Sequence, residues 1–218
     1  MGRNLKWSKL ALLVSMTLGI FLQANFAFAY SGSAAASYAD SYAINPNWGT
    51  YGIELQDDCT DFVSQSLAAG GLPQETDNGT NVKSDPYEWW FSGFGSTASY
   101  TWAWSAANNL RNFLLYYSPY PNYFGSDYGT YSGDSTYPVN DVYTGDPLFY
   151  DWTSSGTYDH AAIQVAYGND TNLAYDNQYL QGDLIDEHTN NRYHAFWTLI
   201  QYNSQFLTTT IDAVRIVQ

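Results

Sequence analysis

The sequence predicts an α+β fold in which N-terminal helices pack on a mostly antiparallel sheet. Three stretches in the first half of the chain have helical periodicity, whereas the last third holds short apolar runs separated by turn residues. Helices grouped before strands favour this class over alternating βα units. No repeat or second composition block interrupts residues 30–218, so we expect one domain with its own core.

The first 29 residues have the pattern of a secretory signal peptide. Three basic residues at positions 3–9 precede an apolar run over residues 10–22, and Ala-Phe-Ala at 27–29 offers a cleavage site. The run is shorter than the roughly 20 residues that a membrane span needs. An uncleaved anchor is the alternative. We expect a secreted protein whose cleaved chain has no stable membrane association.

The chain after residue 29 is strongly acidic. It holds four basic residues and all 21 acidic ones, which gives a formal charge of −17. This charge repels polyanions and therefore argues against a nucleic-acid partner. Anionic wall polymers and anionic lipid surfaces are poor long-range partners for the same reason, and solubility alone can account for the charge.

The periodicities place the helices and strands along the chain. Three helices are expected. The first covers residues 30–44, the second has Cys59 in its first turn and is about three turns long, and the third covers residues 101–117. The expected strands cover residues 145–152, 160–167, 183–189 and 208–217. Residues 72–98 and 118–144 are rich in turn residues and are expected to be loops. The second loop is long for a compact domain, which favours a lid or a substrate wall.

Cys59 is the only cysteine and cannot form an intramolecular disulfide, so it is inert, an intermolecular link or a reactive thiol. Asp57 or Asp58 can cap a helix that Gly70 and Gly71 end, which places Cys59 in the first turn. A helix N-terminus lowers a thiol pKa and offers N–H groups to an oxyanion. The adjacent Asp58 carboxylate opposes the thiolate, so a base is needed.

The chain offers three histidines as bases. His160 begins an expected strand and is the candidate base. His188 ends the next strand and is the candidate for the group that orients His160, with Glu187 behind it. His194 follows an expected loop and receives no role. A cysteine followed about a hundred residues later by a histidine is compatible with cysteine hydrolases.

Five segments share the motifs and the order of a known domain family. They are Asp58–Gln65 (DCTDFVSQ) with Ala-Gly-Gly at 69–71, Tyr38–Ala43 with Asn-Pro-Asn at 45–47, Ser99–Trp102, Gly145–Trp152 with Asp159–Ile163, and Glu187–Asn190. On these residues the chain resembles the putative amidase domain of bacterial exported proteins. That family is similar to CHAP- and NlpC-type wall hydrolases.

The resemblance implies a papain-like, NlpC-like fold. It also implies Cys59 as nucleophile, His160 as general base and His188 as the third polar residue. The chain has Asp61 where the family commonly has Asn, and Ser66 where it often has a second cysteine. Neither Asp61 nor Ser66 has a role in the chemistry that the resemblance implies.

These observations predict a secreted cysteine hydrolase that cleaves amide bonds, with cell-wall peptides of peptidoglycan as the expected substrate. The Cys59 thiolate attacks the carbonyl and His160 protonates the leaving amine. Acyl transfer to an amine instead of water uses the same residues and stays open.

Two further classes of function were weighed. A non-catalytic module could bind glycan through Trp89, Trp90, Trp102 and Trp104, but a binder needs neither the cysteine nor the histidines. Two histidines with Asp159 or Asp186 could ligate zinc, but the H-x-x-x-H spacing is absent and Cys59 would be unexplained. We therefore expect no metal and no cofactor.

Overall fold

The computed structural model describes residues 29–52, 55, 57–76, 79, 82–119, 123–139 and 142–217. The expected signal peptide lies outside the described residues, apart from Ala29. Within the described residues, no helix combines the length and the apolar character needed to cross a membrane.

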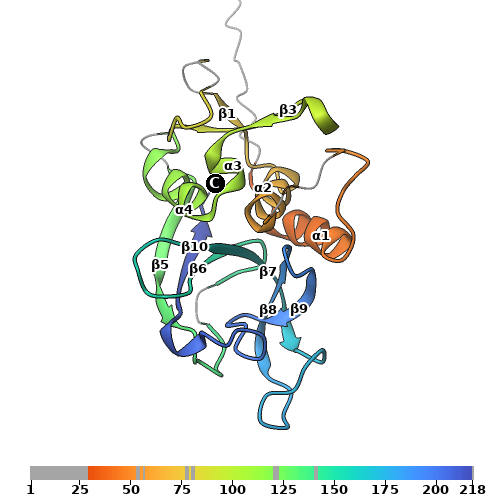
Figure 1. The fold of residues 1–218 in the computed structure, drawn as a ribbon, viewed down its shortest axis with the longest axis vertical. Helices are drawn as coiled ribbons and strands as arrows, with labels where there is room; N and C mark the ends of the chain where they lie inside the picture. The colour runs from red at the N-terminus through yellow and green to blue at the C-terminus, as the bar shows by residue number, and fades with distance from the viewer. Residues whose placement is uncertain are drawn as a thin grey trace, which may run out of the picture.

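A six-stranded antiparallel sheet forms the centre of the molecule (Figure 1). Its strand order is β5-β10-β6-β7-β8-β9. The strands are β5 (Gly125–Ser132), β6 (Pro147–Asp151), β7 (His160–Asn169), β8 (Gln181–Glu187), β9 (Arg192–Phe196) and β10 (Thr210–Ile216). This sheet and the helices before it confirm the predicted α+β class.

The helices lie along one side of this sheet, above it in Figure 1, with α1 and α2 beside β7. They are α1 (Gly32–Tyr42), α2 (Cys59–Ala69), α3 (Trp102–Ser105), α4 (Ala107–Asn112) and a π turn, η2 (Phe113–Tyr117). Alternate residues of β6 face opposite layers. Phe149 packs into the helix-side core, whereas Leu148 and Tyr150 pack against the segment that follows β9. Both faces of the sheet are therefore covered.

Helix α2 is the most enclosed helix of the fold, since every residue from Cys59 to Leu67 is buried. Gly71, with φ +94°, supplies the left-handed residue after the last turn, as the sequence predicted. Inside the helix, Ser64 Oγ donates to the Trp104 carbonyl and accepts from Trp89 Nε1. These bonds satisfy a polar side chain that would otherwise be costly to bury.

The close approach of α1 to the start of β6 requires glycine on both sides. Gly145 has φ +93°, and a Cβ there would overlap the backbone of Gly32. A Cβ on Gly32 would in turn overlap the Thr144 carbonyl. Ser31 begins α1 as its N-cap, with its side chain accepting from the N–H of Ala34.

The predicted helix over residues 101–117 is wrong as a single element. Ala106 has extended dihedrals, φ −130° and ψ 126°, which separate α3 from α4. In α3, before the break, Trp104 is buried in the core and Trp102 is exposed. Tertiary packing therefore overrides a sequence whose local propensity is helical.

Both expected loops contain strands. Residues 72–98 include β1 (Glu75–Thr76), β2 (Glu88–Trp89), β3 (Phe91–Ser92) and a 3₁₀ turn, η1 (Gly95–Thr97). Strand β3 pairs with β4 (Ser99–Tyr100). Residues 118–144 hold β5, an edge strand paired with β10, which corrects the expectation of a continuous loop there.

Residues 190–193 were also expected to be a loop, but Arg192 and Tyr193 begin strand β9. Its apolar signal is limited to two residues, so only pairing with β8 reveals it. A last 3₁₀ turn, η3 (Phe206–Thr208), precedes β10.

Candidate active site

Three elements converge where β7 begins and β8 ends. These strands are antiparallel neighbours, so the first residue of one and the last residue of the other lie at the same end of the sheet. Helix α2 packs on β7. The arrangement brings together Cys59 at the start of α2, His160 at the start of β7 and Glu187 at the end of β8.

Cys59 is buried, with 5% of its surface exposed, and its thiol contacts His160 and the backbone of Ala161. Burial raises the pKa of the Cys59 thiol, but His160 outweighs burial and the pKa ends below its usual range. Thr60 Oγ1 also lies 3.6 Å from the sulfur. The thiol is thus held in a setting that favours the thiolate.

His160 bridges the thiol and a carboxylate. Its Nε2 bonds to Oε2 of Glu187, which leaves Nδ1 as the ring nitrogen available to Cys59. Burial lowers the pKa of His160, but the charges of Glu187 and Cys59 raise it to about 10. The ring also stacks on Trp152, with centroids 5.4 Å apart. Both shifts favour the thiolate of Cys59 and the imidazolium of His160.

Glu187 is enclosed between two cationic groups. Its second oxygen accepts from Arg192 Nη1, and the Arg192 guanidinium lies over the ring of Tyr202 at 4.5 Å. Burial raises the pKa of Glu187, but His160 and then Arg192 hold it below its usual value. A carboxylate fixed on both sides can orient the imidazole and stabilise its charge.

The position expected for His188 is occupied by Glu187. His188 instead binds Asp58 Oδ2 through Nδ1 at 2.7 Å and the Tyr42 carbonyl through Nε2 at 2.8 Å. Its ring stacks on Phe62, with centroids 4.0 Å apart. Successive side chains of a strand point to opposite faces, so Glu187 and His188 serve different neighbours.

This contact also shows where Asp58 points. One carboxylate oxygen binds His188, and the other accepts from the Thr189 N–H at 3.1 Å. Asp58 is the N-cap residue of α2, but its side chain makes no hydrogen bond to the helix. Both ring nitrogens of His188 face oxygen atoms, so the ring is fixed between Asp58 and the Tyr42 carbonyl.

A pocket of about 210 Å³ adjoins the His160–Glu187 pair. Its lining residues are Trp152, His160, Glu187, Asn190, Arg192, Leu199, Tyr202, Asn203 and Gln205. Cys59 is not one of them. The pocket thus presents polar and aromatic groups next to His160, but the motif that carries the cysteine does not line it.

The structure does not form the predicted tryptophan platform. Trp89 and Trp104 are fully buried and Trp90 is 5% exposed, whereas Trp102 is 54% exposed. Trp104 Nε1 donates to the Asp61 carboxylate and Trp90 Nε1 to Glu88. Three of the four rings are therefore part of the core.

The zinc set considered from sequence is not assembled either. His160 and His188 bond to different carboxylates, and Asp159 accepts from the Trp152 N–H. Among the described residues, potential ligands gather instead as Asp40, Asp186 and His194.

Two contributors were missed from sequence. Glu187 was placed behind His188, although strand alternation allows only one of the two to face His160. Arg192 was given no role, although it is one of only four basic residues after residue 29. Because basic residues are so rare in this acidic chain, the presence of Arg192 was the signal that could have indicated its role.

Among the comparisons with known proteins, a family model identifies the family of this chain. A family described as "Putative amidase domain" matches residues 29–211. The uncharacterized protein YjcM of Bacillus subtilis (strain 168) is 32% identical over 151 residues, which are 64% of this chain and 29% of YjcM. The uncharacterized protein YhbB of the same organism is 24% identical over 145 residues, 64% of this chain and 38% of YhbB.

The chain thus spans well under half the length of each of these relatives. No solved structure matches the chain. The family match covers most of the sequence and includes Cys59, His160 and Glu187. The chain belongs to the putative amidase domain family.

Proposed function

We propose that this protein is a cysteine-dependent amide hydrolase with Cys59 as nucleophile, His160 as general acid and base, and Glu187 as the residue that orients His160. The observation that carries the proposal is the unbroken series of contacts from Cys59 through His160 and Glu187 to Arg192. Membership of an amidase family supports amide hydrolysis as the reaction class.

The contacts define the steps. Cys59 Sγ attacks the amide carbonyl carbon, and the electron pair of the C=O bond moves to oxygen. As the tetrahedral intermediate collapses, the C–N bond breaks and the His160 proton passes to the leaving amine. Neutral His160 then takes a proton from water, which attacks the thioester, and the acid leaves as the Cys59 thiolate is restored.

The start of α2 is suited to the charge that develops. The first N–H groups of a helix have no partner within the helix, and its dipole favours an anion at that end. Cys59 is the first residue of α2, so the oxygen of a carbonyl group whose carbon is bonded to Sγ lies beside these groups. They can serve as an oxyanion hole.

The papain-like assignment is part of this proposal. It is supported by a nucleophile at a helix N-terminus that packs on an antiparallel sheet, with the base on a sheet strand. Secretion rests on the sequence pattern of residues 1–29.

For the substrate we propose peptide bonds of the bacterial cell wall. Export and the family's resemblance to wall hydrolases support this choice. The amides and the guanidinium of the pocket beside His160 can bind peptide carbonyl and carboxylate groups. The net negative charge favours a peptide over an anionic polymer.

Thiol reactivity tests the mechanism before any substrate is known. We would follow iodoacetamide labelling of Cys59 against pH in the protein and in its His160→Ala variant. The expected result is rapid labelling with an apparent pKa well below about 8.5, lost or shifted in the variant. A thiol that is inert, or that behaves like free cysteine with or without His160, would rule the mechanism out.

With a reactive thiol established, peptidoglycan fragments would be screened, and the acyl-enzyme would be trapped and measured by mass spectrometry. A mass increase on Cys59 that disappears on incubation in water identifies a hydrolase. An adduct that is released only after a primary amine is added identifies an acyltransferase.

A further inference from the structure

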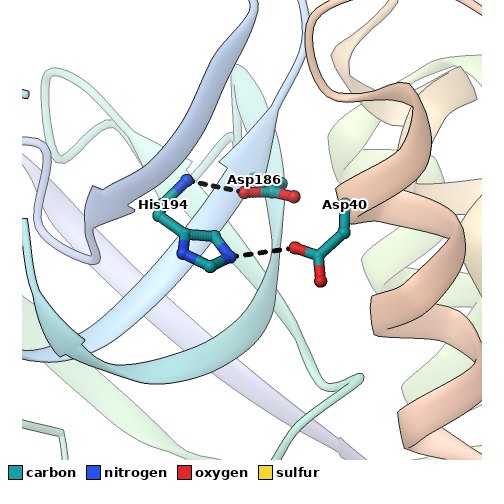
Figure 2. Close-up of side chains that lie close together, drawn as sticks. All are labelled: Asp40, Asp186 and His194. Atoms are coloured by element: carbon teal, nitrogen blue, oxygen red, sulfur yellow. Dashed lines mark hydrogen bonds and ion pairs between the residues drawn. The ribbon is translucent and has the colours of Figure 1, made fainter.

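A second group of ionisable side chains lies close to the candidate active site. Asp40 from α1, Asp186 from β8 and His194 from β9 meet there, as Figure 2 shows. One ligand atom from each of the three lies within 4.8 Å of the other two. His194 Nε2 is 2.9 Å from Asp40 Oδ1, and the His194 N–H donates to Asp186 Oδ1 at 2.7 Å.

Asp186 is the unusual member of this group. It is fully buried, and its Oδ2 has no hydrogen-bond partner among the described residues. Figure 2 shows this oxygen on the side of Asp186 that faces Asp40. An unpartnered buried carboxylate oxygen is expensive, and a second carboxylate supplies only further acceptors. A proton or a cation is required between the two acids.

The local charge favours a cation. Asp186 is buried and the Asp40 carboxylate lies beside it, so a positive charge between the two acids would be favourable. The basic side chains of the described chain have other contacts: Arg111 with Asp212, Arg192 with Glu187, and Lys83 and Arg215 over tyrosine rings. Two carboxylates and an imidazole thus stand together in a strongly acidic chain.

We propose that Asp40, Asp186 and His194 form a binding site for a divalent metal ion of the zinc type. One imidazole nitrogen and two carboxylate oxygens suit Zn²⁺, whereas Ca²⁺ and Mg²⁺ favour oxygen ligands throughout. Asp40 and His194 are 40% and 28% exposed at their side chains, so both can turn toward an ion and water can complete its coordination.

The site would be structural and would hold α1 against the sheet. Asp186 directly precedes Glu187, and Asp40 lies two residues before Tyr42, whose carbonyl binds His188. An ion bound here therefore ties together the elements that position Glu187 and the start of α2. It would not take part in the reaction, because Asp186 and Glu187 point to opposite faces of β8.

Zinc binding is measured by isothermal titration of ZnCl₂ into chelator-treated protein that carries Cys59→Ala. This change removes a thiol that could itself bind zinc beside His160. The expected result is one ion per chain. In the same background Asp186→Asn and His194→Asn weaken binding by about 100-fold or more, since each removes a ligand. Asparagine at 194 also tolerates the left-handed backbone found there, φ +55°.

Asp134→Asn is the matched control, because it removes an exposed carboxylate far along the chain from the cluster and should leave binding unchanged. Asp40→Asn changes a side chain that is 40% exposed, so it provides a ligand variant that keeps the buried side chains intact. At a zinc concentration a hundredfold above Kd, the melting temperature of the protein with all three ligands should rise by about 5 °C. The melting temperatures of the ligand variants should not rise.

Absence of binding at millimolar zinc would overturn the proposal and leave a shared proton between Asp40 and Asp186. Binding that survives all three ligand substitutions would overturn it as well, because the ion would then occupy another site. Neither result depends on hydrolase activity, since the titration uses a variant without the nucleophile.

Discussion

The Nε2 atom of His160 is hydrogen-bonded to the Glu187 carboxylate, and both side chains are buried. Arg192 holds the other oxygen of Glu187, so the carboxylate cannot turn away from the ring. His160 is consequently presented to Cys59 through Nδ1. The geometry places Glu187, and not the neighbouring His188, in contact with the His160 ring.

Replacing Glu187 with glutamine should reduce kcat/KM by about 100-fold or more, because a neutral amide no longer stabilises the imidazolium. The apparent pKa of Cys59 in labelling experiments should rise as the pair weakens. Asp134→Asn, which removes an exposed charge, should change neither quantity. Unchanged labelling in Glu187→Gln would show that Glu187 does not act on the thiol through His160.

The pH dependence of kcat/KM should be bell-shaped. The acid limb reports protonation of Cys59, whose pKa lies below its usual range, and the alkaline limb reports loss of the His160 proton near pH 10. The plateau between them corresponds to the thiolate–imidazolium pair. In Glu187→Gln the alkaline limb should move to lower pH. A profile limited by a group near pH 6.5 on its alkaline side would contradict the ion pair.

Asp61 should make the protein less stable as the pH rises from about 4 to 7. Burial raises its pKa in the folded state to about 7, although Trp104 and Gln65 donate to it. Below pH 4 the carboxyl is protonated in both states. Above this pH, Asp61 ionises first in the unfolded chain, so the free energy of unfolding falls as the pH rises. Once the pH passes the pKa of Asp61 in the folded state, the free energy of unfolding levels off.

Asp61→Asn should remove this dependence, because asparagine keeps an acceptor for Trp104 and cannot ionise. A turn of the Gln65 amide would preserve its bonds to residue 61 and to Tyr38, since the tyrosine hydroxyl can donate or accept. Urea unfolding at pH 5 and pH 7.5 should show a smaller difference in the variant. Equal differences in the two proteins would mean that Asp61 is ionised throughout.

His188→Ala should destabilise the fold by about 3 kcal/mol, since it leaves one oxygen of the buried Asp58 carboxylate without the His188 contact. It should also slow labelling of Cys59 at neutral pH, because the uncompensated charge beside the sulfur disfavours the thiolate. Asp58→Ala with His188→Ala should recover part of both losses. If the two effects simply add, the pair is not coupled.

Local sequence signals determined the parts of this protein that depend on neighbours along the chain. The glycines after Ala69 set the end of α2, and turn residues set the limits of β6, β7 and β10. The motif at Cys59 indicated the family, and the single cysteine identified the candidate nucleophile. A helix end and a hairpin are specified within a few residues, so one chain suffices to predict them.

Tertiary structure alone decided which of Glu187 and His188 faces His160, because the sheet register selects the face of each residue. It also turned residues 125–132 and 192–196 into strands, whose pairing partners lie far away in sequence. The break at Ala106 and the meeting of Asp40, Asp186 and His194 have the same origin. Contacts between distant segments produce them, and no local pattern carries that information.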